Sequence, residues 1–262
     1  MSRQDRRIPG WLSGAVVLSV FLALAWAEHR KPLREQNSSK ARRNVRNLAV
    51  AGLSGMTLRI LEKPIVEPLS SAVEERRWGL LKLVQLPPWA ETMAAIALMD
   101  YTLYLWHVAA HRLPALWRLH QVQHADLDMD ASTALRFHAA EMAVSMPYRA
   151  AQVVLLGVSS RPHSIWQTLV FVCILFHHSN LRLPAWLERL LSPVLVTPSM
   201  HGIHHSVVDK EVNSKWSSGL TVWDWLHGTL RLDVRQEEIE IGAPAIARKN
   251  KLHFRSFSRC SS

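Results

Sequence analysis

The chain has 262 residues, a hydrophobic fraction of 48% and a formal net charge of +10. This length is enough for one moderately large domain or two small ones, and the two cysteines, Cys173 and Cys260, exclude a disulfide framework and a zinc ribbon. Long apolar runs alternate with dense Arg/Lys stretches, which is typical of a membrane protein with polar lobes. The basic residues gather directly after an apolar run, where anionic headgroups attract them, so we expect no nucleic-acid partner.

The N-terminal part of the chain predicts a membrane anchor followed by a basic linker. Residues 11–27 are uncharged and nearly long enough to cross the bilayer, which takes about 20 residues. A signal peptide is the alternative, but further apolar segments follow and favour an anchor. Residues 28–46 predict a polar linker with seven Arg or Lys side chains. Residues 47–61 predict a weaker span that ends near Pro64 and Pro68.

The middle of the chain predicts a further span and a polar lobe. Residues 89–106 are apolar except for Glu91 and Asp100, and they lead directly into the first histidines. Residues 112–141 are largely polar and predict a folded lobe outside the lipid.

A helical hairpin is predicted next. Its arms are residues 142–158 and 164–176, joined by the turn SSRPH. The second arm is short for a full span, so we expect the helix to continue and to carry His177 and His178 beyond the lipid.

These segments predict an all-α integral membrane protein with four to five transmembrane or membrane-embedded helices and a cytoplasmic helical lobe. Because basic loops stay in the cytoplasm, a cytoplasmic 28–46 linker places the N-terminus outside. The chain then crosses the membrane out and back and returns to the cytoplasm near His107. All the clustered histidines then lie on one side. The expected regions are an anchor with its linker (1–46), a membrane-embedded domain (47–232) and a basic polar tail (233–262).

Histidine is the unusual residue of this chain, since eleven of the fourteen lie between His107 and His205. Spacings of i, i+3 and i, i+4 align imidazoles along one face of a helix and suit metal binding. Burying so many imidazoles without partners would cost on the order of several kcal/mol, so a shared metal site is favoured over core packing. The candidate ligands are His107, His111, His120, His124, His138, His177, His178, His201, His204 and His205.

The ligand type narrows the metal without identifying it. Nitrogen ligands suit iron, copper, zinc or nickel rather than calcium or magnesium. There are more histidines than one ion can hold, which implies two ions. The chain has no H-E-x-x-H sequence, which disfavours zinc protease chemistry.

Five stretches of the chain carry a family resemblance: DYTLYLWHVAAHRLPALWRLHQVQHAD, STALRFHAAE, FHHSNLRLP, VTPSMHGIHHS and WDWLHGTLR. Over roughly residues 95–232 the chain resembles the fatty acid hydroxylase/sterol desaturase superfamily. The resemblance implies an α-helical membrane enzyme with a cytoplasmic di-iron centre. Such an enzyme uses dioxygen and electrons from a reductase chain to hydroxylate or desaturate a lipid, which could be fatty acyl, sterol-like or isoprenoid. The implied partners are this lipid, the bilayer and an electron-transfer protein or reductase, and the implied location is the bacterial inner membrane.

The resemblance also assigns roles to residues. Glu141 and Asn180 are the candidate catalytic residues, as groups that would hydrogen-bond to and orient the ligands, although structural hydrogen bonding is an equal alternative. His138 and His177 are additional candidate ligands. The implied iron ligands are His107, His111, His120, His124, His178, His201, His204 and His205.

One position departs from the family pattern. The second histidine box would have histidine at position 123, where this chain has Gln123, a poorer ligand for iron. Two alternatives remain beside an active oxygenase, and Gln123 bears on the first of them. One is a catalytically impaired member that acts as a membrane scaffold, and the other is a zinc-dependent membrane hydrolase.

Overall fold

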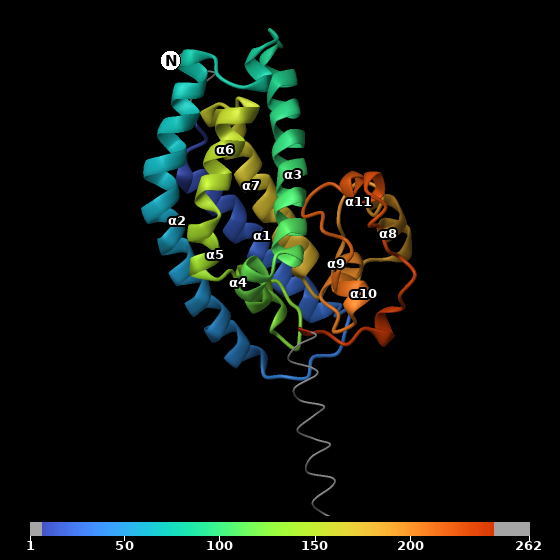
Figure 1. The fold of residues 1–262 in the computed structure, drawn as a ribbon. Coiled ribbons are helices and arrows are strands. Elements are labelled where there is room, and N and C mark those ends of the chain that lie inside the picture. Colours follow the sequence, from blue (N-terminus) through green and yellow to red (C-terminus); the bar gives the residue numbers. More distant parts are fainter. Residues whose placement is uncertain (1–6, 244–262) are drawn as a thin grey trace, which may run out of the picture.

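The computed structural model describes residues 7–243, in which the regular structure is helical and no β-strand forms. The all-α prediction is confirmed for this part of the chain, and the end of the predicted basic tail lies outside the described residues. An antiparallel bundle forms the larger part of the fold (Figure 1). Its helices are α1 (Gly10–Arg30), α2 (Lys40–Arg76), α3 (Pro88–Arg112), α5 (Ala139–Val144), α6 (Met146–Leu156) and α7 (Ser160–His178).

Shorter elements complete the fold at one end and one side of the bundle. α4 (Pro114–His124) and the 3-10 turn η3 (Thr133–Leu135) lie at the end of the bundle, and the turn η2 (Leu80–Lys82) precedes α3. A lobe lies beside the lower half of α3 in Figure 1. It consists of α8 (Ala185–Leu191), α9 (Pro198–His204), α10 (Asp209–Val212), α11 (Val222–Leu226) and η4 (Gln236–Glu238).

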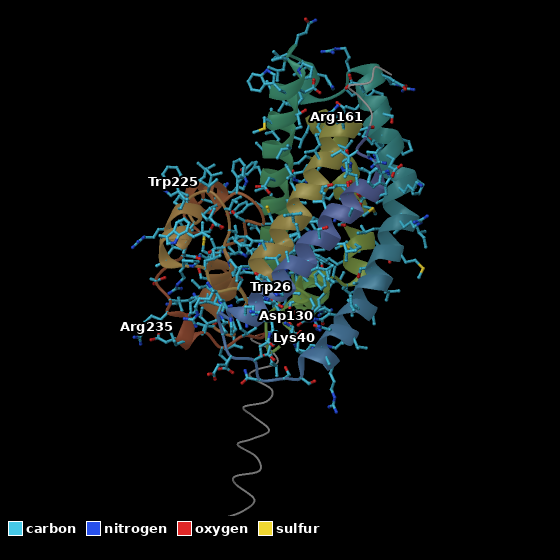
Figure 2. The ribbon with its side chains drawn as sticks, turned by 180° about the vertical axis from the view of Figure 1, so that it is seen from behind. Trp26, Lys40, Asp130, Arg161, Trp225 and Arg235 are labelled. Atoms are coloured by element: carbon cyan, nitrogen blue, oxygen red, sulfur yellow. The ribbon has the colours of Figure 1, made fainter. Side chains whose placement is uncertain are left out.

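The chain direction brings the histidine-bearing ends of α3 and α7 to one end of the bundle. α1, α3 and α7 run one way, and α2 and the α5–α6 pair run the other way (Figure 1). Figure 2 shows Arg161, in the first turn of α7, at one end, with Lys40 and Asp130 at the other. The clustered histidines therefore lie at the same end as the connection between α1 and α2. The sequence predicted this shared end.

Two of the described helices are long and apolar enough to cross a membrane. They are α1 and α3, with mean hydropathies of 1.9 and 1.2 in their most apolar windows. The outer side chains of α1, including Leu18, Leu22 and Trp26, are exposed, and lipid is the environment that would cover such a surface. The spans predicted at 11–27 and 89–106 correspond to these two helices.

The predicted end of a helix near Pro64 and Pro68 is wrong, because α2 continues through both prolines to Arg76. Neither proline can donate an amide hydrogen, so each leaves one helical carbonyl without its usual partner. Both prolines are at exposed positions of α2. The opposite face buries Val66 and Val73 against α6, and this packing holds the helix together.

Two other predicted boundaries also move. The linker is shorter than 28–46, because α1 extends to Arg30 and α2 already begins at Lys40. The predicted turn SSRPH mostly forms the start of α7, since Gly157 ends α6 in the left-handed conformation (φ 78°). The first arm of the hairpin is divided into α5 and α6 at Ser145. The predicted extension of the second arm to His178 is confirmed.

Buried charges tie the first two helices to the loop that follows α4. The guanidinium of Arg43 on α2 is buried and forms ion pairs with Asp128, at 3.0 Å, and with Asp130. Glu28 of α1 accepts hydrogen bonds from the amides of Ala131 and Asn180, each at 3.0 Å. Breaking such buried pairs leaves uncompensated charge, so these contacts hold the histidine-rich end of the bundle in place.

Candidate metal centre

A proline break places the first two histidine pairs opposite each other. α3 ends at Arg112 and α4 begins at Pro114, with Leu113 between them in an extended conformation. Proline disfavours a helical conformation in the residue before it, so the chain turns here and α4 packs back against α3. The two i, i+4 pairs that then face the same space are His107/His111 and His120/His124.

The other clustered histidines come from the end of α7 and from α9. His177 and His178 are the last two residues of α7. α9 begins at Pro198, a favourable first helical position, after Thr197, whose hydroxyl accepts the amide of Met200. α9 packs against α7 and supplies His201 and His204, and His205 follows directly as its C-cap.

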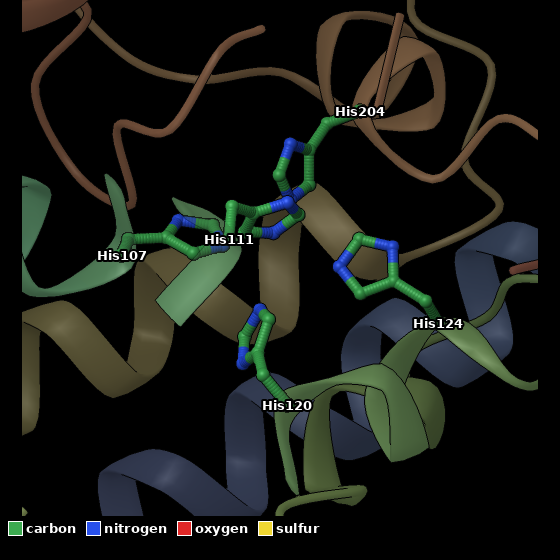
Figure 3. A group of neighbouring side chains, drawn as sticks. All are labelled: His107, His111, His120, His124 and His204. Atoms are coloured by element: carbon green, nitrogen blue, oxygen red, sulfur yellow. The ribbon is translucent and has the colours of Figure 1, made fainter. Parts of the chain in front are cut away.

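Five histidines from three helices form a first group. One ring nitrogen of each lies within 4.8 Å of the corresponding nitrogen of all the others. Figure 3 shows the rings converging from α3, α4 and α9. His204 is close to the rings of three members, with centroid distances of 4.7, 4.6 and 4.9 Å. The members are His107, His111, His120, His124 and His204.

Hydrogen bonds at the outer ring nitrogens leave the inner nitrogens of this group free to bind a metal. Nδ1 of His107 and Nδ1 of His204 face backbone carbonyls at 2.7 and 2.8 Å, and Nδ1 of His120 faces a carboxylate at 2.9 Å. Because these oxygens only accept, each Nδ1 carries the hydrogen and each Nε2 presents a lone pair. The Nε2 atoms of all three, and that of His111, are buried without a hydrogen-bond partner among the described residues.

These converging lone pairs fit a metal ion. A buried polar atom without a partner costs about 1–3 kcal/mol, and the first group places several of them together. An ion at their centre would satisfy all of them at once. Imidazole nitrogens suit iron, zinc, copper and nickel, so the donor set fits the iron that the resemblance implies without distinguishing it from the other metals.

A second, smaller group lies beside the first and consists of His177, His178 and His201. Nε2 of His201 is 3.2 Å from Nε2 of His178 and 3.1 Å from Nε2 of His205. His205 also stacks on His124, with 4.1 Å between ring centroids, and so joins the two groups. The described residues thus contain two adjacent groups of imidazoles, each of which could hold a metal ion.

Gln123 belongs to the second group by position. Its amide nitrogen lies 3.2 Å from Nε2 of His178. Nδ1 of His178 donates to the carbonyl of Ile174 at 2.9 Å, so this Nε2 is the lone-pair nitrogen that a metal would bind. The glutamine therefore occupies the place where the family pattern puts an imidazole, next to the second group.

Burial keeps several of these imidazoles neutral, which is the form that binds metals. It lowers the pKa of His204 to about 3. It also lowers the pKa values of His124, His201 and His205 well below the ordinary value, and the neighbouring histidines add to this effect. These rings therefore present lone pairs throughout the neutral pH range.

The three remaining candidates have different positions. Glu141 accepts the Nδ1 hydrogen of His120 at 2.9 Å, as expected of a group that orients a ligand. Asn180 does not contact a histidine side chain through its amide, which instead pairs with the backbone of Arg34 at 2.9 and 2.8 Å. Nδ1 of His138 accepts the amide of Ala140 and caps α5, and His138 belongs to neither group.

Sequence patterns did not reveal a short loop that supports the first group. The carbonyls of Ser214 and Trp216 receive the Nδ1 hydrogens of His204 and His107. Lys215 between them has the left-handed φ of 56°, and Asp224 accepts the amide of Trp216 at 2.9 Å. Backbone carbonyls leave no signature in a sequence, so only the fold could reveal these contacts.

A cavity of about 250 Å³ leads away from both groups into the bundle. Histidines of both groups line one end, and apolar side chains such as Leu103, Met142 and Phe171 line its walls. A larger cavity of about 560 Å³ lies between residues 33–37 and 236–241 but has no histidine in its lining. Of these two cavities, the smaller one reaches the candidate metal centre.

The chain is similar in sequence to several known proteins. Ornithine lipid hydroxylase OlsE of Rhizobium tropici is 28% identical over 159 residues, which cover 60% of this chain and 47% of that protein. Alkylglycerol monooxygenase of Homo sapiens is 25% identical over 163 residues, covering 60% of this chain and 34% of that protein. Cholesterol 25-hydroxylase-like protein of Danio rerio is 27% identical over 158 residues, covering 59% of each chain. This chain thus spans less than two thirds of these relatives, and no solved structure matches it significantly.

The fold and the site define a class of helical protein with membrane-type helices and a buried, histidine-rich candidate metal centre. The fatty acid hydroxylase family matches residues 92–229, which contain every histidine of both groups. The chain belongs to the fatty acid hydroxylase family.

Proposed function

We propose that this protein is a membrane-bound di-iron oxygenase that hydroxylates or desaturates a lipid. The observation that carries the proposal is the pair of buried histidine groups at the end of a largely apolar cavity. The names of the relatives support it, since each describes a hydroxylase or a monooxygenase. Family membership supports oxidation over the zinc hydrolase alternative.

Two iron ions would be held by the two histidine groups, with His205 between them. Bound iron, together with electrons from a reductase chain, would supply the activation of dioxygen that an unactivated C–H bond requires. The chain itself orients the imidazoles of His120, His204 and His107 through Glu141 and the carbonyls of Ser214 and Trp216. Such fixed hydrogen bonds orient ligands and tune their basicity.

The cavity would bind the lipid and determine which carbon reacts. Its apolar walls, among them Trp106, Val170 and Ile174, exclude water and match an apolar chain. Since a C–H bond must lie next to the oxidant, the register of the chain in the cavity determines the position of attack. Whether hydroxylation or desaturation follows depends on the substrate radical after hydrogen removal.

The proposal includes a topology. Four to five helical segments of the bundle would be membrane-embedded, and the histidine-bearing end would face the cytoplasm of a bacterial inner membrane. The basic start of α2, including Arg42 and Arg46, supports this orientation, because positive charge stays inside. An electron-transfer protein or reductase would then approach the histidine-bearing end.

Two measurements test the proposal. Elemental analysis of the detergent-purified chain should find two irons, whereas zinc alone would support a hydrolase and no metal a scaffold. Lipidomics of a deletion strain against the wild type should find a lipid that lacks one hydroxyl group or double bond.

A matched pair of variants makes the test specific to the site. His204→Ala should lose iron and lipid product, because His204 lies among the other members of the first group. His227→Ala replaces an exposed histidine outside both groups and should keep both. Full oxygen-dependent modification by His204→Ala would refute the metal assignment.

A further inference from the structure

The cavity that reaches the histidine groups has a second polar end. Glu62 of α2, Arg149 of α6 and Gln167 of α7 line it together with the apolar walls. α7 carries both ends, because Gln167 precedes His177 by ten residues. At a rise of 1.5 Å per residue, the two positions are separated by about 15 Å along the helix axis.

The three polar side chains contact one another across three helices. Nη1 of Arg149 lies 3.3 Å from a carboxylate oxygen of Glu62, and the other oxygen of that carboxylate accepts the side-chain amide of Gln167. Nε of Arg149 donates to Oγ of Ser145 at 3.0 Å. We call Glu62, Arg149 and Gln167 the polar trio.

Hydrogen-bonding capacity remains free in the polar trio. The contact of Nη2 of Arg149 is Sδ of Met142 at 4.0 Å, and a thioether is a weak acceptor. The guanidinium has five N–H donors, and most of them have no oxygen acceptor among the described residues. An oxygen atom entering the cavity would find these donors.

The polar trio is expected to stabilise the contact between its three helices no better than apolar packing would. Ion pairs away from water often stabilise a fold no better than well-packed apolar side chains of similar volume, and charged residues in membrane proteins commonly mark a functional site. Glu62 and Arg149 are both largely buried, with side-chain exposures of 12% and 26%. Because Glu62 and Arg149 line the cavity, they can contact a molecule bound there, a role that helix packing alone would not need.

The charge of the polar trio indicates the kind of group that it would bind. Glu62 offsets the positive charge of Arg149, so this end of the cavity has no net charge when both are ionised. A carboxylate or phosphate would add an unpaired negative charge in a poorly hydrated place. A hydroxyl or amide can accept from Arg149 and donate to an oxygen of the polar trio without adding charge.

We propose that the polar trio binds a neutral hydroxyl or amide group of the lipid substrate and sets the distance to the carbon that reacts. The inference rests on the proposed function for the reacting end of the cavity. The substrate class is a neutral lipid with a hydrogen-bonding group about 15 Å from the attacked C–H bond, which is the spacing of the two ends along α7. An acyl chain without such a group would lose its register in the cavity.

Binding of simple probes tests this inference separately from catalysis. The full chain in detergent is incubated with tritiated hexadecanol, which is then displaced by unlabelled hexadecanol, palmitamide, palmitate or hexadecane. The alcohol and the amide should displace it at least about tenfold better than the alkane, as expected for about one buried hydrogen bond. Equal displacement by hexadecanol and hexadecane would overturn the inference.

One substitution should redirect the preference. Glu62→Gln leaves Arg149 without its counter-charge, so palmitate should become the better competitor. A purely structural role would not produce this reversal. The control is Glu91→Gln. Glu91 also forms an ion pair, with Lys82, but it does not line this cavity, so this variant should keep the wild-type order of competitors. A folded Glu62→Gln chain that still prefers the alcohol to palmitate contradicts the inference.

The two proposals fail in different ways. A chain that prefers hexadecanol but binds no iron and oxidises no lipid contradicts the proposed function while supporting the polar trio as a binding site. A chain that oxidises lipid but does not distinguish hexadecanol from hexadecane contradicts only the polar trio. If Glu62→Gln does not fold, the comparison of hexadecanol with hexadecane on the wild-type chain still tests whether the polar trio binds a hydroxyl group.

Discussion

Glu141 accepts the Nδ1 hydrogen of His120 across 2.9 Å, and both side chains are buried. The bond joins α5 to α4 and points the Nε2 lone pair of His120 toward the first group. A carboxylate in this place also strengthens the imidazole as a ligand. Glu141 thus acts through His120 rather than on a substrate directly.

Glu141→Ala should therefore lower iron affinity and activity by about 10–100-fold, the usual effect of removing the partner of a ligating imidazole. Iron titration of the purified chain and product formation in cells measure the two effects. Glu141→Gln should lose less, because its amide oxygen can still accept the Nδ1 hydrogen. Unchanged iron affinity in Glu141→Ala would show that this bond does not orient a ligand.

Gln123→His should increase the iron bound at limiting concentrations. The amide nitrogen of Gln123 lies against the lone pair of His178, where a histidine would add a further ligand. Iron per chain, measured after loading with substoichiometric iron, tests this expectation. Gln121→His is the matched control. The side chain of Gln121 donates a hydrogen bond to a carbonyl of α4 in an exposed position, so this substitution should not change the iron content. A loss of iron in Gln123→His would show that the glutamine itself supports the site.

The lowered pKa of the buried Lys215 predicts that the stability of the fold depends on pH. Burial lowers the pKa of Lys215 to about 7, and its Nζ atom has no hydrogen-bond partner among the described residues. The unfolded chain keeps this proton up to about pH 10. Between these pH values the unfolded state binds more protons than the folded state, so stability should rise with pH.

Lys215→Met should remove this rise and stabilise the protein at neutral pH. Because a buried, unpaired charge is replaced by an apolar chain, we expect a gain of about 1 kcal/mol or more, or an increase in Tm of about 2–4 °C. Thermal unfolding in detergent at several pH values measures both effects. Lys210→Met, at an exposed position nearby, should leave the pH profile as it is. A fall in Tm at neutral pH would mean that Nζ has a stabilising partner.

Arg43→Met should destabilise the fold by about 3–5 kcal/mol, because it leaves Asp128 and Asp130 buried without their counter-charge. Arg46→Met is the control on the same helix. Arg46 pairs with Asp126 at 3.0 Å, but its side chain is 54% exposed, so its loss should cost less than about 1 kcal/mol. Chemical denaturation in detergent compares the two variants. Equal effects would show that burial does not make the Arg43 pairs different.

Local patterns made much of this protein predictable. The i, i+4 spacing of His107 and His111 fixes their common helix face whatever the surrounding fold. The apolar runs of α1 and α3 were recognisable for the same reason, since length and composition suffice to identify such helices. The family pattern then pointed to the candidate ligands, and nine of the ten lie together at one end of the bundle.

Long-range contacts were not predictable in this way. Asn180 stands close to His178 in the chain, yet its amide pairs with the backbone of Arg34, which lies 146 residues away. Pro64 and Pro68 predicted a helix end, but packing of the opposite face of α2 against α6 outweighs the lost backbone bonds. In both cases a partner distant in the chain decides the outcome.

The sequence alone determined the helical class, the histidine sets and their common end of the bundle, because helical periodicity and hydropathy act over a few neighbouring residues. Only the tertiary structure decided how the histidines divide into two groups and which backbone carbonyls orient them. It alone also placed Glu62 and Arg149 on the wall of the cavity. These relationships join residues from different helices, and their distances depend on packing that no local pattern encodes.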